Sequence, residues 1–79
     1  MELTYLLYYC KKGKAIIWVV DLLKEKKVVY KIKRLDERFA NVEIISKESN
    51  TNENFKIEWG DLERKIKNKE WAIGSFQNL

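Results

Sequence analysis

Lysine side chains are the groups in this sequence whose type and spacing suggest a chemical role. They gather in the first half of the chain, in two polar segments and along the strand-like segment after them, at Lys11, Lys12, Lys14, Lys24, Lys26, Lys27, Lys31 and Lys33. Residues 1–34 contain nine Lys or Arg and three Asp or Glu, a net charge of +6, whereas residues 35–79 contain seven and nine, a net charge of −2. This asymmetry favours an anionic partner on one side of the molecule, and the phosphates of a nucleic acid are the candidate.

A pair of tyrosines precedes the first lysine cluster. Tyr8 and Tyr9 are neighbours, and in a strand neighbouring side chains point to opposite faces. Either the sheet is covered on both sides there, or one ring is exposed, and Tyr9, beside Lys11 and Lys12, is the candidate. Such a ring could stack on a base, anchor a partner protein or pack on a neighbouring side chain.

The 79 residues include few candidate catalytic side chains. The chain has no histidine, so neither its three serines nor its single cysteine, Cys10, has the usual base, and the commonest metal ligand is missing. Asp36 and Glu37 are adjacent and are interpreted as a solvated turn, and Cys10 as a small buried apolar residue. We expect no enzymatic activity, no cofactor, no metal site and no small-molecule substrate.

The segments that carry or flank the lysines are predicted to be β-strands. Apolar β-forming segments alternate with polar turns, which predicts six strands at residues 3–10, 15–23, 28–34, 39–46, 55–59 and 70–76. In the third of these, Lys31 and Lys33 alternate with apolar residues and should face solvent. Gly13 is predicted to take a positive φ in the first turn, and residues 47–52, the most polar stretch, to form a mobile loop.

One segment breaks the two-residue period. Leu62 and Ile66 lie four apart, so residues 60–69 are predicted to form a helix of about two turns that docks through these two side chains. Asp61 is the candidate N-cap. Asn68 is predicted to end the helix in the left-handed conformation.

The fold class that follows is mainly β, in a single small domain spanning residues 1–79. Short connections between successive strands favour antiparallel pairing, and closure of the sheet would remove its exposed edges. We predict a small, partly open antiparallel barrel of about six strands with one short helix before the last strand, which resembles an SH3-like barrel by pattern. Trp18, Trp59 and Trp71 fall on apolar faces and are interpreted as core.

These features predict a non-enzymatic module that binds nucleic acid through the lysine-rich surface of the N-terminal hairpin, with little sequence specificity. The alternative is a protein-interaction module, such as a small phage or mobile-element protein that docks on a host factor and modulates it. In that case exposed apolar residues such as Ile17, Val19 or a tyrosine would make the contact. The lysines also have a purely solubilising interpretation, as charges that prevent association between strand edges.

Composition adds an expectation about location. The longest apolar run, residues 15–20, is far shorter than the ~20 residues that span a bilayer, and a lone cysteine suits a reducing compartment. We therefore expect a cytoplasmic protein without a membrane partner. Abundant Lys, Asn, Ile and Glu are typical of AT-rich genomes, such as those of many low-GC bacteria and their phages.

Overall fold

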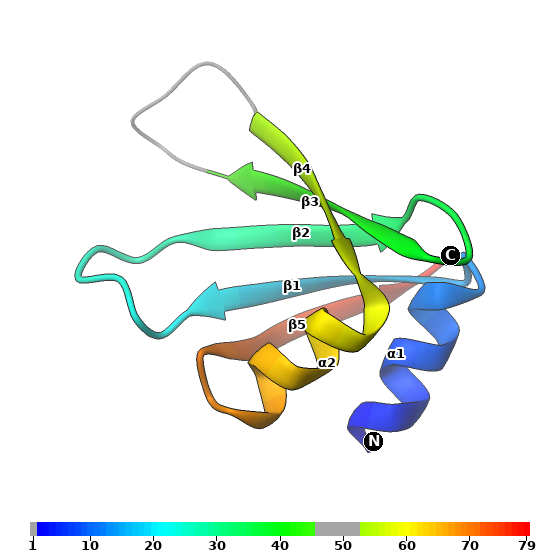
Figure 1. Ribbon diagram of the computed structural model, residues 1–79, viewed down its shortest axis with the longest axis horizontal. Helices are drawn as coiled ribbons and strands as arrows, with labels where there is room; N and C mark the ends of the chain where they lie inside the picture. Colours follow the sequence, from blue (N-terminus) through cyan, green and yellow to red (C-terminus); the bar gives the residue numbers. More distant parts are fainter. Residues whose placement is uncertain (1, 46–52) are drawn as a thin grey trace.

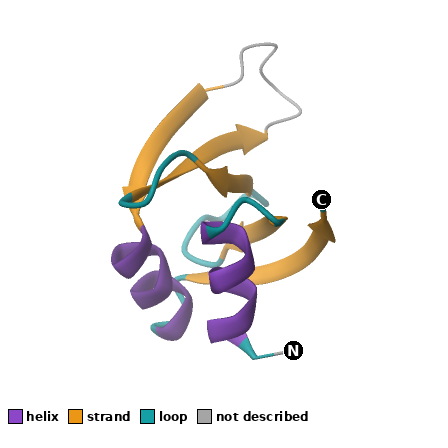
Figure 2. Cartoon of the chain, turned by 90° about the vertical axis from the view of Figure 1, so that its right-hand side faces the viewer, coloured by secondary structure: helices purple, strands orange, loops and turns teal. Residues whose placement is uncertain are grey.

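The computed structural model describes residues 2–45 and 53–79, which form an antiparallel five-stranded sheet with two helices on one face (Figures 1 and 2). In chain order the elements are α1 (Leu3–Lys11), β1 (Ala15–Asp21), β2 (Val29–Arg34), β3 (Phe39–Ile45), β4 (Glu53–Glu58), α2 (Trp59–Lys67) and β5 (Trp71–Asn78). The strand order in the sheet is β4-β3-β2-β1-β5. Strands β1 to β4 are therefore a meander, and α2 returns the chain so that β5 pairs with β1.

The core lies between the sheet and the helices. Alternate residues of the inner strands point toward α1 and α2, and the largest fully buried side chains are Ile17, Ile32, Leu62, Val19, Val42 and Cys10. The alternation of apolar and polar residues in the sequence thus reflects a sheet with one face covered by helices and one face open, as in many antiparallel sheets. The face toward the helices is called the inner face below, and the opposite face is called the outer face.

The prediction of a strand at residues 3–10 is wrong, because this segment forms α1. Leu3, Leu6, Leu7 and Cys10 follow the spacing of one helix face, and all four pack toward the core. The tyrosines between them lie on the exposed side of the helix. Aromatic residues favour strands only where a pleated surface accepts them, and here burial of the helical apolar face outweighs that preference.

The helix before the last strand is confirmed, but its ends differ from the prediction. It begins at Trp59 rather than after Asp61, and no side chain caps its first turn. Trp59 is buried, and its indole N–H donates a hydrogen bond to the carbonyl oxygen of Asp36 at 3.2 Å, which ties the helix start to the β2–β3 turn. At the other end Lys69, not Asn68, has the left-handed backbone conformation, with φ 60°.

The sheet is open in the described residues, because its terminal strands β4 and β5 pair with β3 and β1 and not with each other. The mainly β, antiparallel class is confirmed, while five strands replace the predicted six. Gly13 has the predicted positive φ, 76°, and the loop predicted at residues 47–52 lies outside the described residues. Both helices of the described chain have nine residues, too few for a membrane crossing.

A buried carboxylate joins β1 to β2 at the end of the sheet near the β1–β2 connection. Asp21 is only 7% exposed, accepts a hydrogen bond from the hydroxyl of Tyr30 at 2.7 Å, and accepts another from the backbone N–H of Leu23 at 2.9 Å. Burial alone would raise the pKa of Asp21, but these hydrogen bonds outweigh it and hold the pKa below its ordinary value. Burial and the neighbouring carboxylate raise the pKa of Tyr30 to about 12.

We expect Tyr30→Phe to lower the free energy of unfolding by about 1–3 kcal/mol at pH 7, because a buried carboxylate oxygen loses its donor. The ring, which packs 4.6 Å from that of Trp71, is retained. The folded-state pKa of Asp21 is depressed, so its stabilisation is present above about pH 4 and is lost as pH falls. The cost of Tyr30→Phe should therefore shrink between pH 7 and pH 3, measured by urea unfolding. An equal cost at both pH values would show that the hydroxyl does not act through the carboxylate.

Candidate nucleic-acid interface

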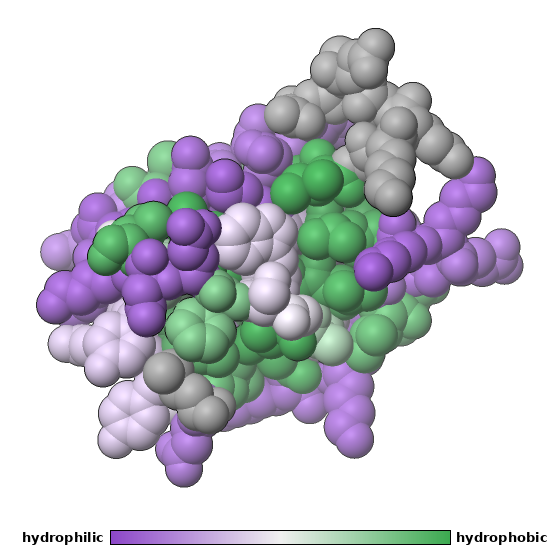
Figure 3. All heavy atoms as spheres, turned by 180° about the vertical axis from the view of Figure 1, so that it is seen from behind, coloured by the Kyte–Doolittle hydropathy of each residue, from purple (hydrophilic) through white to green (hydrophobic). Residues whose placement is uncertain are grey.

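The outer face of the sheet carries aromatic, apolar and basic side chains together. Figure 3 looks at the molecule from behind Figure 1 and shows apolar side chains across the middle of this face, with hydrophilic side chains around them. The cross-strand register defines its rows. One row is Ser75, Trp18, Lys31, Glu43 and Asn54. A second row on the same face is Lys33, Asn41 and Lys56, and Ile16 pairs with Gln77.

Trp18 lies on the outer face of β1, between Ser75 of β5 and Lys31 of β2, and is partly buried. Beside it is a shallow hollow of about 370 Å³, lined by Trp18, Val20, Lys27, Val29, Gly74 and Ser75. Gly74 forms part of its wall, and a Cβ at that position would make ordinary van der Waals contacts, at 3.7 Å, with the Trp18 carbonyl oxygen and Val20 Cγ2. The interpretation of Trp18 as core is therefore wrong, whereas Trp59 and Trp71 are buried as predicted.

Two of the predicted lysines lie on this face. Lys31 and Lys33 point outward from β2, as their alternation predicts, and Lys31 Nζ lies 5.9 Å from the centroid of the Trp18 ring. That distance is within the range of a cation–π attraction. Lys56 of β4 joins them, with its Nζ 4.4 Å from the centroid of the Phe39 ring. Sequence reasoning did not select Lys56, which sits among acidic residues in the chain but opposes Asn41 in the sheet.

The remaining predicted lysines lie at the two ends of β1. Lys24, Lys26 and Lys27 are exposed in the connection between β1 and β2, and Lys27 reaches the hollow beside Trp18. Lys11, Lys12 and Lys14 are exposed around the turn between α1 and β1, at the opposite end. Seven residues of β1 place about 20 Å between the two groups. The nine-residue strand predicted from sequence implied about 30 Å.

An arginine completes the basic group near the α1–β1 turn. Arg34 Nε donates a hydrogen bond to the carbonyl oxygen of Lys11 at 2.9 Å. The two residues, together with Lys12 and Glu37, line an open depression of about 400 Å³. Arg34 was missed as a candidate because nothing in the linear sequence indicated that the end of β2 reaches α1.

Tyr9 is exposed to 39%, but it lies on α1 and not on a strand. Its ring makes an edge contact with that of Tyr8 at 5.9 Å, and Lys12 Nζ lies 5.7 Å from the Tyr8 centroid. The argument from opposite strand faces is wrong here, because adjacent residues of a helix are both able to reach solvent. Lys12 therefore lies near Tyr8. Tyr9 belongs to α1 and is not part of the outer face of the sheet.

The other reactive groups have structural roles. Cys10 is fully buried, its Sγ donates to the carbonyl oxygen of Ile32 at 3.6 Å, and burial raises the pKa of its thiol to about 11. Asp36 accepts hydrogen bonds from the backbone N–H groups of Phe39 and Arg38, which hold the pKa of its carboxyl below the ordinary value. Among the described residues, no group of three acidic or cysteine side chains is placed to hold a metal ion.

Taken together, the arrangement presents a tryptophan at a hollow, two lysines beside it on the same face and more basic residues at both ends of the same strands. Comparisons with protein-family models, with curated protein sequences and with solved structures find no match for this chain.

Proposed function

We propose that this protein is a non-enzymatic, cytoplasmic module that binds single-stranded nucleic acid on the outer face of its sheet. Trp18 stacks on a base at the hollow, and Lys27, Lys31 and Lys33 neutralise neighbouring phosphates. The observation that carries this proposal is the partly exposed Trp18 at a hollow that Lys27 also lines. Stacking on aromatic rings combined with basic side chains is the general chemistry of single-strand binding without strong sequence preference.

The spread of aromatic and basic groups over the sheet surface favours a single strand over a duplex. The aromatic and basic groups are spread over a sheet surface, so an unpaired base could lie flat on Trp18 while its backbone follows the lysines of β2. A base inside a duplex presents only its edge, and its flat surface is already stacked. Lys31 beside the Trp18 ring also adds a positive charge where a phosphate would follow a stacked base.

The test is a set of substitutions at Trp18, measured by fluorescence anisotropy with labelled single-stranded DNA and RNA. Loss of one stacked base costs about 1–3 kcal/mol, so Trp18→Leu should weaken binding roughly 5- to 150-fold. Trp18→Phe should restore much of the affinity, because it keeps an aromatic face. Tyr5→Leu is the matched control, since Tyr5 is exposed on α1, in the helical layer.

Wild-type affinity weaker than about 100 μM at near-physiological salt would be no better than non-specific association and would contradict the proposal. So would a folded Trp18→Leu variant that binds as well as the wild type. In either case the protein-interaction alternative becomes the better explanation. Its contact residues would not include Ile17 or Val19, because both side chains are fully buried.

A further inference from the structure

Strand β5 is an edge strand that carries neither charged side chains nor proline, two of the features that keep sheet edges apart. The opposite edge, β4, carries Glu53, Lys56 and Glu58. Residues 71–78 of β5 contain no charged residue and no proline, although the whole chain is 35% charged.

The side chains of β5 follow an unusual facing pattern. Pairing with β1 turns four residues to the inner face, namely Trp71, Ile73, Phe76 and Asn78, and turns three to the outer face, namely Ala72, Ser75 and Gln77. The register shifts between Trp18 and Val19, where Gly74 is the extra residue of a bulge. A Cβ on Gly74 would lie beside the outward side chain of Val20, so Gly74 also faces outward.

From residue 71 to residue 78 the pattern is therefore in, out, in, out, out, in, out, in. It reads the same from either end, with its centre between Gly74 and Ser75. Residues opposite each other in antiparallel strands share a face. A second β5, turned about a two-fold axis at this centre, would match every inner residue with an inner one, and every outer residue with an outer one. Ser75 would oppose Gly74, and Phe76 would oppose Ile73.

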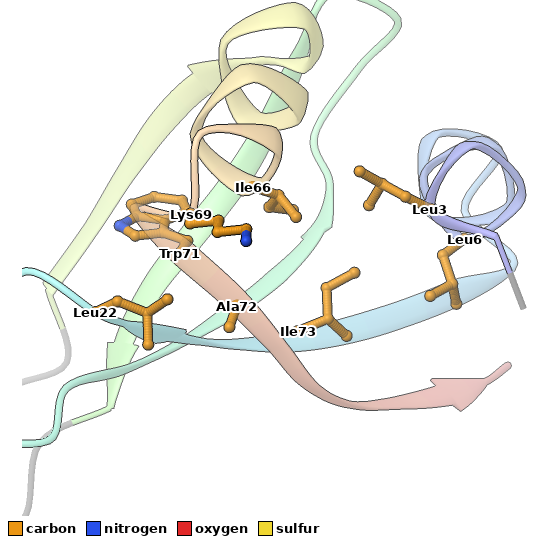
Figure 4. A pocket seen from close by; sticks show the side chains of 8 residues that line it. All are labelled: Leu3, Leu6, Leu22, Ile66, Lys69, Trp71, Ala72 and Ile73. Carbon is orange, nitrogen blue, oxygen red and sulfur yellow. The ribbon is translucent and has the colours of Figure 1, made fainter.

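An apolar groove runs along the inner side of the same edge. Figure 4 shows Leu3 and Leu6 from α1 and Ile66 from α2 facing Ile73 across it. The groove has a volume of about 520 Å³ and is lined by Leu3, Leu6, Leu22, Ile66, Lys69, Trp71, Ala72 and Ile73. Phe76 points to the inner side and is 42% exposed. In the paired arrangement, Phe76 of a second copy would lie next to Ile73, at this groove.

We propose that β5 pairs antiparallel with β5 of a second copy of this chain, forming a continuous ten-stranded sheet about a two-fold axis. The contact is isologous, as in most symmetric dimers. A neutral strand suits this role in a chain of net charge +4, because the pairing brings two copies together through a segment that holds no lysine. The proposal is independent of nucleic-acid binding and is tested without it.

Sedimentation equilibrium from about 1 μM to 1 mM should show a reversible monomer–dimer equilibrium. Ser75→Lys places two like charges beside the axis and should raise the dissociation constant at least about tenfold. Asn54→Lys, an outward residue of the other edge strand, is the matched control and should leave it unchanged. A wild-type protein of monomer mass throughout this range would overturn the proposal, as would equal effects of the two variants.

Disulfide trapping tests the register. In the proposed pairing the two copies of residue 75 lie about 6 Å apart, within disulfide range, whereas the two copies of residue 77 lie about 16 Å apart. Ser75→Cys should therefore form a covalent dimer under mild oxidation, and Gln77→Cys should not. The wild type is the background control, because its Cys10 is fully buried. Equal trapping at both positions, or none at Ser75→Cys, would contradict the register.

Discussion

Replacing Leu62 with alanine is expected to lower the free energy of unfolding by about 2–5 kcal/mol. Leu62 is fully buried and belongs to the core cluster that joins α2 to the sheet and to α1. A domain of this size has a total stability of only about 3–5 kcal/mol. The Leu62→Ala variant should therefore be largely unfolded at 37 °C, as measured by circular dichroism in thermal and urea titrations.

Ile66 is the matched control for this experiment. It lies one turn further along α2 and is only partly buried, at the rim of the groove over β5. From their spacing alone, Leu62 and Ile66 are expected to contribute equally to docking. From their burial, we expect Ile66→Ala to lower the free energy of unfolding clearly less than Leu62→Ala. Equal losses from the two substitutions would show that α2 docks in a different orientation.

Neutralising three lysines on the outer face is expected to reduce affinity for single-stranded nucleic acid roughly 100-fold at about 0.1 M salt. Each phosphate contact on a single strand contributes about 0.7 to the log–log salt slope through counterion release. Lys27, Lys31 and Lys33 replaced by Gln should therefore lower the magnitude of that slope by about 2. Anisotropy titrations at several salt concentrations measure both quantities.

A second set of three substitutions tests whether the loss of affinity comes from the outer face itself or only from the lower net charge. Arg64, Lys67 and Lys69 belong to α2 or follow it, in the helical layer, and replacing them by Gln changes the net charge by the same amount. Arg64 and Lys67 form exposed ion pairs with Asp61 and Glu63, which contribute little to stability. Binding should change far less in this set. Equal losses in the two sets would contradict binding at the outer face.

Local sequence pattern is sufficient to predict the parts of the fold in which periodicity and burial agree. The alternation of apolar and charged residues correctly predicts that Tyr30 and Ile32 are buried while Lys31 and Lys33 face outward. Successive side chains of a strand point to opposite faces, and only one face of this sheet is covered. The spacing of Leu62 and Ile66 identified the helix before the last strand. The absence of histidine led to the prediction that the chain is not an enzyme, which stays a prediction.

Packing between distant elements determines which face of each apolar segment is covered, and local pattern does not reveal it. Residues 3–10 contain both strand-forming tyrosines and a helical spacing of leucines, and packing of the leucines against β1 and β2 selects the helix. Both faces of β1 are apolar, so the sequence could not show that Ile17 and Val19 meet the helices while Trp18 stays on the open side.

The assembly of the candidate sites also depends on distant pairing. Gly74 lies beside Trp18, and Arg34 lies beside Lys11, only because β5 and β2 pair with β1. The uncharged composition of residues 71–78 is visible in the sequence, but not that this strand forms an edge. Strand order is set by long-range packing and not by local propensity, and this order leaves β5 at an edge and places β1, with Trp18, between β5 and β2.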